Sequence, residues 1–92
     1  MPSLFIDGEW KDPSTNESYP TINPATEEAV CQIAKGGVKD VDIAVRAARK
    51  AFDDGEWSKL EAKDREKILY KAGDLIDENA DELAYLETVD MG

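Results

Sequence analysis

The stretch GGVKDVDIAVRAARKAF, residues 36–52, marks the point where the hydrophobic pattern of the chain changes its period. After Gly37 the apolar residues recur at the spacing of one helix face, at Val41, Ala44, Val45, Ala48 and Phe52. Asp40 is a favourable N-cap residue, and Gly55 is typical of a helix end. We therefore predict a helix between Asp40 and Gly55 with Phe52 largely buried at the end of its apolar face.

Two more helices are predicted after this one. Ser58 and Glu61 have the spacing of a capping box, but a start at Ala62 is equally compatible with the sequence. Asn79 interrupts the pattern, and Glu82 follows three residues later, which indicates a new helix start. The apolar faces of these two helices consist of Ile68, Leu69, Ala72, Leu75 and Ile76, and of Leu83, Leu86 and Val89. An amphipathic helix has to pack one face against another element.

Before residue 36, short apolar runs alternate with turn residues. Asp7-Gly8 is a strong two-residue hairpin signal, and two further extended segments are predicted at residues 19–22 and 29–34. An arm of two or three such strands is marginal by itself in water. The predicted fold class is thus α+β, with a β-arm over residues 1–35, a helical segment over residues 36–92, and an incomplete core.

Composition excludes several function classes. The chain has 92 residues, a net charge of −10, one cysteine and no histidine. An acidic chain repels nucleic-acid phosphates, and a lone cysteine without histidine cannot build an internal disulfide or a Cys/His zinc site. The sequence shows no secretory signal and no apolar run of the ~20 residues that cross a bilayer. We expect no nucleic-acid or membrane partner and a cytoplasmic location.

The residues that could take part in catalysis or ligand binding are better explained by structural roles. Cys31 lies in an apolar strand without an activating histidine, which favours a buried core cysteine. Gly36-Gly37 lacks the flanking pattern of a phosphate loop and marks a strand-to-helix turn. Trp10 and Trp57 flank turns, where packing at a core edge is favoured over ligand stacking. The acidic clusters lack the calcium-loop pattern and are interpreted as solvated faces.

Glu87 and Asp90 share one face of the last predicted helix and have the spacing of an acid/base pair. Nothing apolar nearby in the sequence would raise one pKa above the other, so this interpretation is disfavoured. The sequence therefore predicts no catalytic residue and no cofactor-binding residue within this chain.

An ordered series of segments nevertheless resembles the opening of an aldehyde dehydrogenase of the broad-specificity, betaine-aldehyde-like group. The matching segments are LFIDGEW at 4–10, YPTINPAT at 19–26, DVDIAV at 40–45, AARKAF at 47–52, GEW at 55–57, and ETVDMG at 87–92. The resemblance implies that the chain is the N-terminal part of an NAD- or NADP-dependent cofactor-binding domain. The family's nucleophile, general base and cofactor turn belong to later segments, so Cys31 does not match the catalytic cysteine.

One site follows from the resemblance alone. The strand at Thr21 and Ile22 matches a segment whose backbone carbonyls hold a monovalent cation in some family members. The resemblance also implies partners, namely the remainder of the enzyme or a second copy in a homo-oligomer. We expect the chain alone to bind no cofactor and to be inactive. The alternative function is an acidic helical interaction or oligomerisation module derived from such an enzyme.

Overall fold

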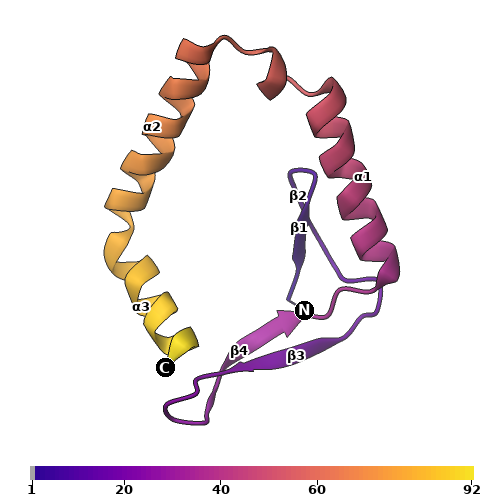
Figure 1. Cartoon of the computed structure of the whole chain (residues 1–92). Coiled ribbons are helices and arrows are strands. Elements are labelled where there is room, and N and C mark those ends of the chain that lie inside the picture. Colours follow the sequence, from indigo (N-terminus) through magenta and orange to yellow (C-terminus); the bar gives the residue numbers. More distant parts are fainter. Residues whose placement is uncertain (1) are drawn as a thin grey trace.

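Two β-hairpins and three helices follow one another along the chain and outline an open ring (Figure 1). The computed structural model describes residues 2–92. In this range the strands are β1 (Leu4–Ile6), β2 (Glu9–Lys11), β3 (Ser18–Ile22) and β4 (Ala29–Ala34), and the helices are α1 (Val38–Asp54), α2 (Ala62–Glu78) and α3 (Ala80–Met91). A short 3₁₀ turn, η1 (Trp57–Lys59), connects α1 to α2. The predicted α+β class is confirmed.

The first hairpin forms as its turn residues predict. Asp7 and Gly8 both have positive φ angles, 53° and 75°, and Ile6 pairs with Glu9 across the turn. Two consecutive residues with positive φ are typical of a type I′ turn, which matches the twist of the flanking strands. The second hairpin pairs β3 with β4, with a register irregularity between Thr21 and Ile22. Residues 2–92 thus hold four strands in two separate sheets, where we predicted two or three strands.

The start of α1 differs from the prediction. Gly37 is the N-cap, and Asp40 lies at the third helical position, where its side chain is buried and accepts a hydrogen bond from the Gly37 amide at 2.8 Å. Asp40 also accepts hydrogen bonds from Ser14, a residue 26 positions earlier. The predicted N-cap was wrong because Asp40 caps the helix from inside its first turn while binding the loop before β3. Of the two predicted starts for the next helix, the structure has Ala62.

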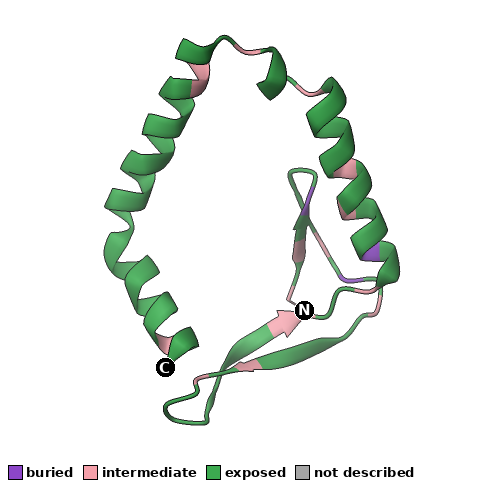
Figure 2. Ribbon diagram, viewed as in Figure 1, coloured by how far each residue is buried: buried purple, intermediate pink, exposed green. Residues whose placement is uncertain are grey.

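The core is small, and four side chains that we predicted to pack in a core or at its edge are exposed (Figure 2). Among the described residues, Ile6 is the one buried apolar side chain apart from Pro13, and it lies between the first hairpin and α1. Phe52, which we predicted to be buried, is 71% exposed. Cys31 is exposed on β4, and both tryptophans are exposed as well. Their apolar character is real, but no element within residues 2–92 lies over them.

The chain exposes more surface than a compact monomer of its mass. The structure exposes 7639 Å², whereas a compact monomer of this mass exposes about 5,300 Å². Its radius of gyration is 16.9 Å, against about 12 Å for a compact domain of the same length. Across residues 2–92, no helix is long and apolar enough to span a membrane. The division at residues 35 and 36 stays an interpretation of the sequence.

Candidate functional site

The N-terminus of α1 is already occupied by a carboxylate of the chain itself. Asp40 accepts hydrogen bonds from the Gly37 amide at 2.8 Å, the Ser14 amide at 3.0 Å and the Ser14 hydroxyl at 2.9 Å. The Gly37 amide lowers the pKa of Asp40 most, burial opposes the shift, and the two Ser14 groups lower the pKa further. A helix N-terminus attracts anions, and here that anion is Asp40.

This arrangement does not fit a cofactor phosphate. A Cβ atom at Gly37 would lie 2.9 Å from the Thr15 methyl carbon and 3.1 Å from the Ser14 hydroxyl, so the surface at this turn is already filled. A phosphate would have to displace Asp40 from the Gly37 amide and would face its negative charge. The structure therefore agrees with a strand-to-helix turn at Gly36-Gly37.

Cys31 lies on the exposed β4 strand, directly opposite Thr21 of β3. Its exposure corrects the expectation of a core cysteine. The chain contains no histidine that could activate the thiol. Glu87 and Asp90, the disfavoured acid/base pair, are both exposed on α3. These residues do not assemble a nucleophile with a base.

Asp90 contacts Thr21, the residue at which the family resemblance implies a cation site. The Thr21 hydroxyl donates a hydrogen bond to the Asp90 carboxylate at 3.0 Å, which links β3 to the end of α3 across 69 positions of sequence. The link lies where the ring closes, near the turn that holds Pro24 and faces Gly92. No pattern local to residue 90 could have predicted this contact.

The Thr21 position is therefore the best candidate site in the described residues. A register irregularity interrupts the pairing of β3 with β4 between Thr21 and Ile22. Backbone carbonyl and carboxylate oxygens are the ligands that hard cations prefer. Within residues 2–92, no group of three or more His, Cys, Asp or Glu side chains could hold a metal ion.

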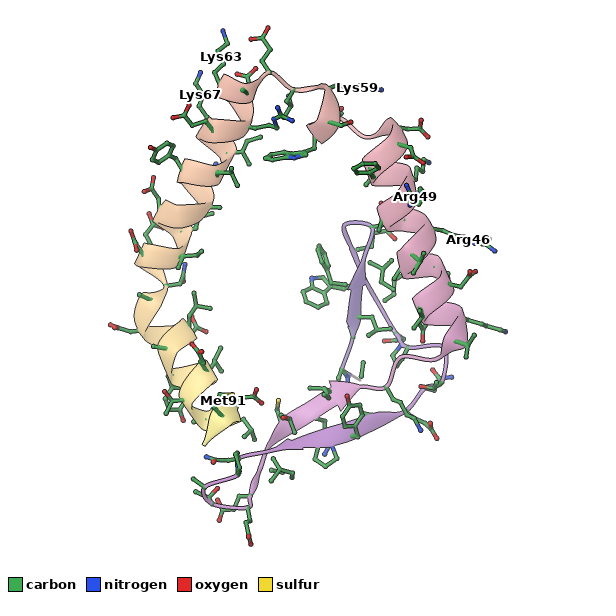
Figure 3. The ribbon with its side chains drawn as sticks, viewed as in Figure 1. Arg46, Arg49, Lys59, Lys63, Lys67 and Met91 are labelled. Carbon is green, nitrogen blue, oxygen red and sulfur yellow. The ribbon has the colours of Figure 1, made fainter. Side chains whose placement is uncertain are left out.

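The remaining charged side chains show no comparable convergence. Figure 3 shows Lys63, Lys67 and Arg46 pointing away from the ring, with Met91 at the far end of α3. Trp57 instead lines an open groove along α2 together with Leu69, Tyr70 and Gly73. These labelled charged side chains thus lie in solvent on the outside of the ring. Within residues 2–92, no element covers the apolar side chains of the groove along α2.

Comparison with known proteins decides the family. The profile of the family described as "Aldehyde dehydrogenase family" matches residues 10–92. The chain belongs to the aldehyde dehydrogenase family. It is 53% identical over 89 residues to aldehyde dehydrogenase 1 of Tanacetum cinerariifolium. These residues make up 97% of this chain and 18% of that relative. It is 46% identical over 90 residues to a mitochondrial aldehyde dehydrogenase of Rattus norvegicus, of which it covers 17%.

Solved aldehyde dehydrogenases contain the same fold. The NAD+ complex of the Bacillus cereus enzyme superposes with a TM-score of 0.88 at 38% identity, over 97% of this chain and 18% of that one. A betaine aldehyde dehydrogenase of Staphylococcus aureus in complex with NAD+ gives 0.89 at 37% identity, over 98% and 18%. The chain thus spans less than a fifth of the length of these relatives. Its two hairpins and three helices are the opening part of the aldehyde dehydrogenase cofactor-binding domain.

Proposed function

We propose that these residues serve as the opening segment of an NAD(P)-dependent aldehyde dehydrogenase that oxidises aldehydes to carboxylic acids. One observation carries the proposal: the whole ring superposes on the NAD+-bound Bacillus cereus enzyme at a TM-score of 0.88 with 38% identity. Aldehyde oxidation with NAD(P) is the reaction of the family to which the chain belongs.

In this proposal the segment acts as a scaffold. Asp40 ties the loop before β3 to α1, and Ile6 packs the first hairpin against the same helix. The exposed apolar faces of the ring are then covered by the remainder of the enzyme. The chain alone brings no nucleophile together with a base, and we expect it to bind no cofactor and to be inactive. We also propose a cytoplasmic location; the similar proteins include a cytosolic 10-formyltetrahydrofolate dehydrogenase of Xenopus laevis as well as the mitochondrial enzyme of Rattus norvegicus.

We further propose that the backbone carbonyls of Thr21 and Ile22 hold a monovalent cation, and that the Asp90 carboxylate, which accepts the hydrogen bond of the Thr21 hydroxyl, contributes its negative charge. The contact of Thr21 with Asp90 at 3.0 Å supports this proposal, because it brings a negative charge to the interrupted strand pairing. Thermal melts in sodium or potassium chloride are compared with melts in tetramethylammonium chloride at equal ionic strength. We expect the smaller cations to raise the melting temperature and Asp90→Asn to abolish the difference. Equal melting temperatures in all three salts would argue against the site.

The scaffold proposal is tested with a chimaera. Residues 2–92 replace the corresponding segment of the Bacillus cereus aldehyde dehydrogenase, and NADH formation is followed with an aliphatic aldehyde. We expect the chimaera to retain NAD-dependent oxidation and the 92-residue chain to show none. A matched chimaera with Ile6→Asp should lose soluble, active enzyme because it places a charge at a buried apolar position. A folded chimaera that binds NAD but has no activity would contradict the proposal.

A further inference from the structure

The turn between β3 and β4 is organised by one residue, Asn23. The side-chain oxygen of Asn23 accepts a hydrogen bond from the Ala25 amide at 2.9 Å. The Asn23 amide donates to the Glu28 carbonyl at 2.9 Å, and the Asn23 carbonyl accepts from the Glu27 amide at 2.8 Å. An asparagine side chain that binds the backbone two residues later forms an Asx turn, which fixes the direction of the chain locally. Asn23 therefore closes this turn with three hydrogen bonds.

The same residue sets the direction of the Ile22 carbonyl. The bond between Ile22 and Asn23 is a trans peptide, and in such a planar group the carbonyl points away from the N–H of the next residue. The Asn23 N–H points at Glu28, which directly precedes β4. The Ile22 carbonyl therefore points to the other side of β3, away from β4. This oxygen is one of the two carbonyls in the proposed cation site, so Asn23 orients a proposed ligand.

The turn also receives the end of α3. Gly92 donates its N–H to the Thr88 carbonyl at 2.9 Å, and its φ angle is 87°. A Cβ atom at Gly92 would lie 2.7 Å from Cγ of Pro24 and 3.0 Å from the Ala25 nitrogen, so α3 ends as close to the turn as a glycine allows. That nitrogen is the one whose N–H the Asn23 side chain binds. Asn23 thus holds the surface against which α3 ends.

The Asp90 carboxylate lies two residues before Gly92 and accepts the hydrogen bond of the Thr21 hydroxyl at 3.0 Å. A hydrogen bond weakens steeply when its geometry is lost, so this contact depends on where α3 ends. We propose that Asn23 is a positioning residue of the cation site. Its turn directs the Ile22 carbonyl and seats the end of α3 so that Asp90 reaches Thr21. This inference rests on the proposed cation site and adds to it a residue that acts through two others.

Two substitutions at one position test this role. Asn23→Ala removes the side-chain oxygen, whereas Asn23→Asp keeps an oxygen that accepts from the Ala25 amide. Melting temperatures of the 92-residue chain are compared in potassium chloride and in tetramethylammonium chloride at equal ionic strength. We expect Asn23→Ala to lose most of the rise that potassium gives the wild type, and Asn23→Asp to retain it.

Asn16→Ala is the matched control for a merely structural loss. Asn16 also lies in an exposed turn, with a φ angle of 53°, which alanine adopts less readily than asparagine. The control should lower the melting temperature in both salts alike and leave the rise in potassium unchanged. A control that loses the rise as fully as Asn23→Ala would overturn the inference, because any weakening of the fold would then have the same effect.

The other outcomes separate this inference from the proposal on which it rests. A wild-type chain that shows no rise in potassium would overturn the cation site and this inference with it. A rise that Asn23→Ala retains in full would overturn this inference alone. A rise that Asn23→Asp loses as fully as Asn23→Ala would also overturn it, because the site would then not depend on the accepting oxygen.

Nuclear Overhauser effects test the seat of α3 without any cation. The α-protons of Gly92 lie against the Pro24 ring, so they should give cross-peaks with its ring protons in the wild type and in Asn23→Asp. We expect these cross-peaks to weaken in Asn23→Ala. Far-ultraviolet circular dichroism checks that each variant keeps its helices. Cross-peaks of full intensity in Asn23→Ala would overturn the role of Asn23 in seating α3.

Discussion

Replacing Ile6 by alanine should be the most costly aliphatic truncation in the chain. Ile6 is 8% exposed and is the one buried apolar side chain with a flexible aliphatic group among residues 2–92. The substitution removes three carbons, which at about 0.8 kcal/mol each gives a loss of about 2.4 kcal/mol. The cavity term should be small, because the grooves beside Ile6 are open and the hairpin can settle toward Ala44. We expect a loss of about 2 kcal/mol, at the low end of the usual range for this change.

Urea denaturation followed by the fluorescence of Trp10 measures this loss, since the Trp10 ring lies 4.9 Å from the Phe5 ring on the same hairpin. A loss of about 2 kcal/mol raises the equilibrium constant for unfolding by a factor of about 30. Ile43→Ala is the matched control, because it removes the same atoms from a side chain that is 45% exposed. The control should cost less than about 1 kcal/mol. Equal losses for the two variants, or no loss at Ile6, would refute the assignment of the core to the hairpin and α1.

Three further outcomes are expected from single residues. Because the pKa of Asp40 is lowered in the folded chain, its carboxylate stabilises the fold above the pKa of an unfolded aspartate, about 3.9. This stabilisation is lost as the pH falls through the lower pKa of the folded state. The urea midpoint of Asp40→Asn should therefore depend less on pH in this acid range than that of the wild type. Phe52→Ala should change the stability of the monomer by less than about 1 kcal/mol, since the ring is 71% exposed, and a larger loss in dilute solution would mean that the ring is buried. Cys31 should react with a thiol reagent in the native chain as fast as in urea, because it is exposed; native-state protection would contradict this.

The local parts of the fold were predictable from the sequence. Asp7-Gly8 fixes its own turn through backbone conformations that few other residues adopt, and the structure has that turn. The helical periodicity after Gly37 likewise depends on residues three and four apart, and helices begin near the predicted positions. The start of α1 was displaced because Asp40 binds Ser14, a partner 26 positions away that local pattern reading does not include.

Burial and the candidate site depended on contacts that are distant in sequence or absent from the chain. Cys31 and Phe52 have the apolar surroundings of core residues, but burial requires an element to lie over them, and residues 2–92 supply none. Asp90 could not be connected with Thr21, because the two meet only where the ring closes across 69 positions. The sequence thus predicted which faces are apolar, and the structure showed which of them are left uncovered.

The central claim is that this chain is an ordered scaffold that does not close its own core. Small-angle X-ray scattering of the chain, extrapolated to zero concentration, tests this most directly. The account predicts a radius of gyration near the 16.9 Å of the structure, together with the helical circular dichroism of α1, α2 and α3. A value near 12 Å, that of a compact domain of this length, would show that the chain closes its own core and would contradict the account. A value near 30 Å, that of an unfolded chain, would contradict it equally.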